Sequence, residues 1–180
     1  MAEVGAGEVG RMAVLFERHH RALFRFFLAM CRDRGLAEDL VQDVFFRMLR
    51  YRHSYDAKQP FTAWMYQIAR NAHLDQVQKR KGEVVSFEEY LERRQEPAEP
   101  SLGAQDQLEK SQDVGLLRRA MERLPEDKRE ILILARYQNL KYEEIAQILG
   151  CEVNTVKVRV FRAVKVLGQI FHELAGEKAS

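Results

Sequence analysis

The chain has 180 residues, of which 46% are hydrophobic and 31% are charged, and its net charge is +2. This length suits one large or two small domains with an apolar core. No apolar run approaches the length of a membrane span, and the N-terminus lacks the basic-then-apolar pattern of a secretion signal, so a cytoplasmic protein is expected.

The cysteines and histidines lack the usual patterns of metal sites and disulfides. Cys31 and Cys151 lie far apart in the sequence, and both are expected to stay reduced in the cytoplasm. No pair of Cys or His residues has the spacing of a zinc site. His19 and His20 are adjacent and would point about 100° apart on a helix, so we interpret them as surface residues. We therefore expect no metal and no cofactor.

The charges are unevenly distributed along the chain. Residues 1–81 hold 14 basic and 9 acidic side chains, residues 82–113 hold 3 and 9, and residues 114–180 hold 12 and 9. Two mildly basic blocks therefore flank an acidic stretch. Basic blocks favour a polyanionic partner, whereas an acidic stretch should avoid one.

The first block is predicted to form three helices. Helical spacing of apolar residues begins near Val14, and Arg34-Gly35 is expected to end that helix. Residues 36–51 form the second, the polar segment 52–60 a loop, and residues 61–81 the third. The buried stripe of the second helix is expected to contain Leu40, Val41, Val44, Phe45 and Met48. The buried face of the third is expected to contain Phe61, Trp64, Met65, Ile68 and Ala72.

The acidic stretch 82–113 is predicted to be a flexible linker. Its segment 95–103 contains two prolines and a glycine and few large apolar residues, a composition typical of linkers. No segment of the chain shows the sustained alternation of a β-strand. We therefore predict an all-α protein with two small helical domains, residues 1–81 and 114–180.

The second block is also predicted to be helical. Residues 114–123 form one helix, Pro125 suits the first turn of the next, and that helix continues to Tyr137. Residues 140–165 then have the pattern of a helix-turn-helix, whose second helix enters the DNA major groove. A solvated amphipathic helix in an ordinary helical domain is the alternative interpretation of this basic helix.

The turn and the two faces of this pair can be assigned from the sequence. Gly150 suits the left-handed conformation that ends a helix. The buried residues of the first helix are expected to be Leu140, Ile145, Ile148 and Leu149. The inward face of the second helix is expected to contain Val153, Val156, Val160 and Val164.

Three sets of segments, in chain order, resemble parts of bacterial sigma factors. Residues 37–45, Ala-Glu-Asp-Leu-Val-Gln-Asp-Val-Phe, resemble the helix by which sigma region two holds RNA polymerase. Residues 61–71, Phe-Thr-Ala-Trp-Met-Tyr-Gln-Ile-Ala-Arg-Asn, resemble its promoter-melting helix. Residues 124–130, 142–146 and 151–159 resemble region four. The chain has no room for the extra domains of primary sigma factors, so it is most similar to the extracytoplasmic-function (ECF) class.

The resemblance implies a subunit that binds RNA polymerase core and directs it to promoters. It would read the minus-thirty-five and minus-ten elements and open the DNA. One face of the second helix would meet basic groups on the clamp helices of the largest polymerase subunit. Without the resemblance, the acidic residues there would be typical of a solvated face. The implied core-binding residues are Asp39, Gln42, Asp43, Phe45 and Phe46.

The loop before the third helix and that helix would contact the minus-ten element. An aromatic ring in the loop can stack on an exposed base, worth about 1–3 kcal/mol, and a pocket that captures a flipped base lowers the cost of opening DNA. Each of three residues also has an alternative interpretation. These alternatives are loop packing for Tyr55, a surface position for Asn71, and a core or strand-separating position for Trp64. Basic residues at the helix end also suit the helix dipole. The implied residues are Tyr55, Trp64, Arg70, Asn71, Lys79 and Arg80.

The second helix of the helix-turn-helix would read the minus-thirty-five element. Val158 departs from the small polar residue common at its position in the family, and it can offer only apolar contact, for example to a thymine methyl. Lys141 stands where a Ser or Thr helix cap is common. The implied DNA-binding residues are Thr155, Lys157, Val158, Arg159, Phe161, Arg162 and Lys165.

The resemblance also implies the partners. They are the RNA polymerase core, through the clamp helices and the flap of the second-largest subunit, promoter DNA, and an anti-sigma factor. Membrane contact is expected only through a membrane-bound regulator. A stand-alone helix-turn-helix regulator is the alternative, although an operator-binding protein needs neither a melting helix nor an acidic clamp face. No glycine-rich phosphate loop, metal set or nucleophile–base pair indicates an enzyme.

Overall fold

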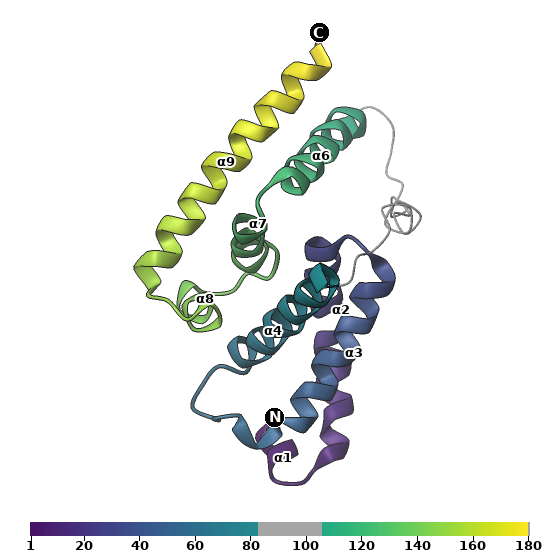
Figure 1. Cartoon of the computed structure of the whole chain (residues 1–180), viewed down its shortest axis with the longest axis vertical. Helices are drawn as coiled ribbons and strands as arrows, with labels where there is room; N and C mark the ends of the chain where they lie inside the picture. Colours follow the sequence, from purple (N-terminus) through teal and green to yellow (C-terminus); the bar gives the residue numbers. More distant parts are fainter. Residues whose placement is uncertain (83–105, 180) are drawn as a thin grey trace.

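The computed structural model describes residues 1–82 and 106–179, and within these ranges the chain is all-α, as the sequence predicts. Figure 1 shows two groups of helices, one from each end of the chain. The elements are α1 (Ala2–Gly5), η1 (Val9–Arg11), α2 (Met12–Cys31), α3 (Arg34–Arg50), η2 (Arg52–Ser54), α4 (Phe61–Gly82), α6 (Asp106–Arg123), α7 (Glu126–Leu132), η3 (Ile133–Tyr137), α8 (Tyr142–Leu149) and α9 (Val153–Ala179).

Helices α2, α3 and α4 form the N-terminal domain. Each contributes an apolar stripe to one core, because residues three and four apart share a face of a helix. The predicted stripe of α3 is confirmed, since all five of its members are buried. From α2 and α4 the core receives Leu23, Phe26, Phe27, Met30, Met65, Ala69 and Ala72.

The break between α2 and α3 falls earlier than the predicted Arg34-Gly35. Arg32 adopts the left-handed conformation with φ of 58°, and the Asp33 carboxylate accepts a hydrogen bond from the backbone N–H of Leu36 at 2.9 Å. An aspartate at this position satisfies a backbone donor that the helix itself cannot. Gly35 therefore lies inside the first turn of α3 rather than in the break.

The C-terminal domain contains α6, α7, η3, α8 and α9. α6 begins at Asp106, eight residues before the predicted start at Val114. Residues 106–113 of the expected linker are therefore helical, and residues 83–105 of it lie outside the described residues. η3 is a π-helical turn that ends the predicted helix over residues 126–137. Asn139, with φ of 51°, then turns the chain toward α8.

The helix-turn-helix forms from α8 and α9. Gly150 adopts the predicted left-handed conformation, with φ of 61°. Val156 and Val160 are buried as expected, but Val164 is 46% exposed and Ala163 is buried in its place. Around the axis of α9, position 163 points closer than position 164 to the mean direction of Val156 and Val160. Ala163 rather than Val164 therefore faces the core.

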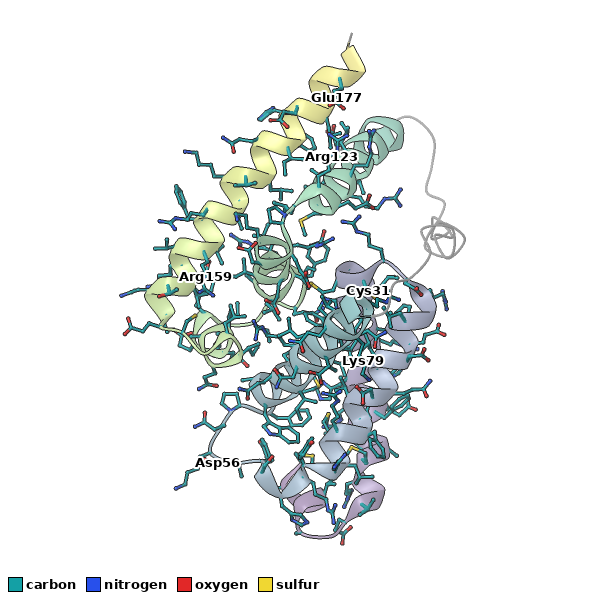
Figure 2. The ribbon with its side chains drawn as sticks, in the orientation of Figure 1. Cys31, Asp56, Lys79, Arg123, Arg159 and Glu177 are labelled. Carbon is teal, nitrogen blue, oxygen red and sulfur yellow. The ribbon has the colours of Figure 1, made fainter. Side chains whose placement is uncertain are left out.

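The last part of the described chain is helical and packs against the C-terminal domain. α9 continues to Ala179 and packs alongside α6, where Leu174 is buried against Leu116 and Ala120. Arg123 and Glu177 form an ion pair at 3.6 Å between the same two helices (Figure 2).

The two domains pack against each other. α4 lies between α3 of its own domain and α8 of the other (Figure 1). Buried apolar residues of both domains form one continuous cluster. α2 also contacts α7 and η3. The chain is therefore folded back on itself, with the third helix of the first domain at the contact.

Candidate nucleic-acid and protein interfaces

The predicted reading surface lies on the outer side of α9. Six of the seven implied residues are exposed, and Thr155 is half-buried. Phe161 is 71% exposed, which is unusual for a large aromatic side chain on a folded protein. Arg159 lies near the start of α9, beside α8 (Figure 2). The surface combines four cations with the apolar Val158 and Phe161, so it can contact both phosphates and base edges.

An aromatic cluster lies where the 52–60 loop meets α4. The Tyr55 ring centroid lies 5.2 Å from that of Trp64 and 6.0 Å from that of Phe61. The Tyr55 hydroxyl donates a hydrogen bond to the backbone carbonyl of Gln59 at 3.2 Å. Tyr55 and Trp64 are both half-buried, so each ring keeps accessible surface.

His19 belongs to the same cluster, contrary to its interpretation as a surface residue. Its ring lies 5.1 Å from the Phe61 ring, and burial lowers its pKa, with a smaller contribution from Arg18. His20 instead stacks on Phe16 at 4.8 Å. No local sequence pattern indicates the Phe61 contact, because it depends on how α2 crosses α4.

The other implied minus-ten residues lie in different environments. Asn71 and Lys79 are exposed, and Lys79 lies toward the end of α4 (Figure 2). The Arg80 guanidinium lies 3.7 Å from the Asp33 carboxylate. The Arg70 guanidinium forms an ion pair with Glu130 of the C-terminal domain, and their atoms Nε and Oε1 are 3.0 Å apart. Arg70 is therefore already paired in this structure.

The implied clamp-binding face of α3 combines charged and apolar side chains. Asp39 and Gln42 are exposed, and Phe46 beside them is 64% exposed. Positions 39, 42 and 46 share one face of the helix. Phe45 differs, because it is 7% exposed and its ring packs 4.9 Å from that of Phe16. Phe45 therefore belongs to the core rather than to this surface.

Asp43 is tied into an ion-pair network that the sequence pattern does not reveal. The Arg47 guanidinium contacts the Asp43 carboxylate at 2.9 Å and the Asp75 carboxylate of α4 at 2.6 Å. The two carboxylates raise the pKa of Arg47 against the opposing effect of burial. This network joins α3 to α4 and orients the charged face.

An apolar groove runs between α6 and α9. Its volume is about 430 Å³, and apolar side chains form most of its lining. It lies away from the α9 residues implied in DNA reading, except where Val164 adjoins them. The groove is lined by Asp113, Val114, Leu117, Val164, Leu167, Gly168 and Phe171.

A row of polar contacts joins α4 to the C-terminal domain. The Tyr66 hydroxyl donates to Gln138 Oε1 at 2.6 Å, and His73 Nε2 lies 3.0 Å from Glu126 Oε1. The Arg70–Glu130 ion pair lies between them, and the row is completed by a hydrogen bond from the Thr62 hydroxyl to Glu144. Positions 62, 66, 70 and 73 form one stripe on α4.

Burial shifts the pKa of three side chains in this row. It raises the pKa of Tyr66, so the phenol stays protonated and donates. It raises the pKa of the Glu130 carboxyl, although the charge of Arg70 acts in the opposite direction. It lowers the pKa of His73 more than the hydrogen bond to Glu126 raises it.

The buried ring of His73 is expected to make stability depend on pH. Protonation would place a second N–H at Nδ1, which is buried without a hydrogen-bond partner among the described residues. The unfolded chain binds this proton near the ordinary pKa of 6.5 and the folded chain only at lower pH. Stability should therefore fall as pH decreases from about 6.5 toward the lowered pKa.

Urea denaturation of the wild type and His73→Gln at pH 7.5 and pH 5.5 measures this effect. The wild type should lose more free energy of unfolding between the two pH values than the variant. Glu130 titrates in both proteins, so the difference between them isolates His73. Equal losses would contradict the expected role of the histidine.

Comparisons with known proteins match both domains of the chain. The family described as Sigma-70 region 2 matches residues 15–83, and the family described as Sigma-70, region 4 matches residues 115–167. The chain is 31% identical over 158 residues to the ECF RNA polymerase sigma factor SigM of Bacillus subtilis, covering 88% of this chain and 93% of SigM. It is 30% identical over 165 residues to the RNA polymerase sigma factor CarQ of Myxococcus xanthus, covering 92% and 91%.

Solved structures show the same fold. The sigma factor RpoE of Bartonella quintana, in complex with the anti-sigma factor NepR, superimposes with a TM-score of 0.68 and 26% identity, covering 89% of this chain and 96% of that one. CnrH, in complex with the cytosolic domain of CnrY, superimposes with a TM-score of 0.68 at 21% identity, covering 96% and 94%. Among the described residues, no helix is long and apolar enough to cross a membrane.

Proposed function

Because this chain belongs to the ECF sigma factors of bacterial RNA polymerase, we propose that it binds the polymerase core and directs it to promoters with two DNA-contacting surfaces. α9 reads the minus-thirty-five element, and the 52–60 loop with α4 reads and opens the minus-ten element. The observation that carries this proposal is the outer face of α9, where cations and an exposed aromatic gather on the second helix of a helix-turn-helix.

We assign the two domains to the two promoter elements. Residues 1–81 act as sigma region two and residues 114–180 as region four, and the stretch between them includes the first turns of α6. The protein acts in the cytoplasm, where its polymerase works. It contributes no catalytic group, because the polymerase performs the chemistry.

Two surfaces are proposed to contact the polymerase. The exposed residues Asp39, Gln42 and Phe46 of α3, with the neighbouring Asp43, meet the clamp helices of the largest subunit. Charged residues around a large exposed aromatic are typical of a binding hot spot and its rim. The apolar groove between α6 and α9 receives the flap of the second-largest subunit, since an apolar pocket of this kind takes apolar side chains of a partner.

A protein regulator is proposed to control access to these surfaces. The support is the similarity to RpoE of Bartonella quintana, which was solved in complex with the anti-sigma factor NepR. Any contact with a membrane then occurs through a membrane-bound regulator. Recovery of polymerase and no other protein when the chain is isolated from uninduced cells would contradict this part of the proposal.

The binding of genomic DNA fragments tests the main proposal. The chain with core polymerase should retain a small set of fragments, and the chain alone should retain few, because its basic blocks are modest. Tight, sequence-specific retention by the isolated chain would instead support a stand-alone regulator that binds operators without polymerase.

Replacing Tyr55 with alanine is expected to slow promoter opening by about tenfold, because a stacked base contributes about 1–3 kcal/mol. Tyr55→Phe keeps the ring and loses only the hydrogen bond to the Gln59 carbonyl, so it should retain most of the activity. Fluorescence of a base analogue at the minus-ten position reports opening. If Tyr55→Phe and Tyr55→Ala open DNA equally slowly, stacking is not the function of Tyr55.

A further inference from the structure

The short helix α1 packs against the base of the loop that carries Tyr55. α1 contacts η2, and Tyr55 directly follows η2. The approach is close at Gly5, because a Cβ atom built there would lie 3.4 Å from the backbone carbonyl oxygen of Arg52. Figure 1 shows α1 at the end of the N-terminal domain from which this loop extends. α1 therefore touches the segment that sets the position of the Tyr55 backbone.

Packing keeps α1 in place. The helix has four residues, too few to be stable by itself in water. Val4 is nonetheless fully buried, and Met1 packs against the apolar cluster that the two domains share. In the described part of the chain, Val4 is not itself a member of that cluster. The burial of Val4 therefore stabilises the local contacts of α1 rather than the main core.

The turn that α1 touches is closed by hydrogen bonds within its own segment. The backbone N–H and the hydroxyl of Ser54 both donate to the Tyr51 carbonyl, at 2.8 Å and 2.7 Å. The Arg52 guanidinium donates to the Leu49 carbonyl at 3.1 Å. These bonds fix the shape of the turn. Contacts with other elements, such as α1, are needed to fix where the turn lies on the domain.

The place of this turn matters for the ring of Tyr55. The backbone leaves η2 at Tyr55 in an extended conformation, with φ of −73° and ψ of 118°, and the ring packs against Phe61 and Trp64 of α4. A ring that is already held in place loses less conformational entropy when a base stacks on it. Support of η2 by α1 therefore favours capture of a flipped base.

We propose that α1 positions the 52–60 loop for promoter opening, with Val4 and Gly5 as positioning residues that act through Tyr55. This inference rests on the proposed function of that loop in reading the minus-ten element. It goes further because it gives a role to residues that precede the stretch matched to Sigma-70 region 2, which begins at residue 15.

The single tryptophan of the chain reports whether α1 holds the loop. The ring centroids of Trp64 and Tyr55 are 5.2 Å apart, so loosening of the loop exposes the indole to a quencher. Val4→Asp places a charge at a buried position and should release α1, which raises the acrylamide quenching constant of Trp64 about twofold. Val9→Asp is the control, because Val9 of η1 is 45% exposed and its replacement meets water. Its quenching should equal that of the wild type.

Promoter opening tests whether α1 acts through Tyr55. With core polymerase and a base analogue at the minus-ten position, Val4→Asp should slow opening about fivefold, less than the loss of the stacking ring itself in Tyr55→Ala. Val4→Ile keeps an apolar side chain and should open DNA at nearly the wild-type rate. Val4→Asp/Tyr55→Ala should open DNA no more slowly than Tyr55→Ala alone, because no ring is left to position.

A milder substitution covers the case in which Val4→Asp does not fold. Val4→Ala removes two methyl groups and should produce smaller changes in the same two measurements. Unchanged quenching in both Val4 variants would overturn the support role while the sigma activity stands. So would a double variant in which the two slowing factors multiply.

Failure of the proposed function gives a different result. If no form of the chain opens promoter DNA with core polymerase, the proposed function is overturned. The quenching of Trp64 then still decides whether α1 holds the loop.

Discussion

Replacing Lys157 and Arg162 together with alanine is expected to weaken binding of the polymerase–sigma complex to its promoter by about 100-fold, because each base or phosphate contact contributes about 1–3 kcal/mol. Both side chains are exposed on the outer face of α9. Binding of the variant to core polymerase should be unchanged. Fluorescence anisotropy with a labelled promoter fragment measures the DNA affinity.

A control double variant tells whether the loss of promoter affinity comes from specific contacts of α9 or from the lost positive charge alone. Arg118→Ala/Arg119→Ala removes two exposed cations of the same domain, on α6. It should change promoter affinity only slightly. Equal losses in the two variants would mean that the domain attracts DNA through its net charge and that α9 does not read the element.

Replacing Phe46 with alanine is expected to weaken binding to core polymerase by about 30-fold, which corresponds to a hot-spot contribution of about 2 kcal/mol. The exposed ring lies on the α3 face that carries Asp39 and Gln42. Because the side chain is 64% exposed in the free chain, its removal should leave the free energy of unfolding nearly unchanged. Surface plasmon resonance with immobilised core measures the affinity.

Tyr137→Ala provides the control for this substitution. Tyr137 is 61% exposed on η3 of the other domain, and no polymerase contact is proposed for it. Its removal should leave core binding within about twofold of the wild type, as expected for a residue outside the hot spot. A loss equal to that of Phe46→Ala would contradict the assignment of the α3 face.

The helices and their inward faces could be predicted from the sequence wherever one apolar stripe decides the outcome. The stripe of α3 and the left-handed Gly150 are examples, because each follows from local geometry. The break at Arg32 escaped prediction because arginine rarely adopts a left-handed conformation. The prediction for Val164 was wrong because Ala163 and Val164 are neighbours that fit the stripe almost equally well, and the larger side chain was chosen.

The proposed interfaces were predictable only in part. The exposed cations of α9 and the exposed Phe46 lie where the motifs indicate them. Phe45 matches the same motif but is buried against Phe16, since a motif does not tell which of two adjacent phenylalanines faces inward. Val158 is an exposed apolar residue on the proposed reading face, so any contribution to base preference would come from a contact such as a thymine methyl.

The contact between the domains has no signature in the sequence. Arg70 and Glu130 are 60 residues apart, and Tyr66 and Gln138 are 72 apart. Such pairs follow no helical period, and polar residues on helix surfaces usually face water. Only the folded arrangement shows that α4 is covered on one side by the C-terminal domain.

Transcription in vitro tests the central claim most directly. Core polymerase of the same bacterium is mixed with genomic fragments, with and without the purified chain, and the RNA 5′ ends are sequenced. The account predicts a set of start sites that require the chain and share two upstream elements at one spacing. It also predicts that Lys157→Ala/Arg162→Ala loses these transcripts. The same start sites with and without the chain, or no specific transcript with it, would contradict the account.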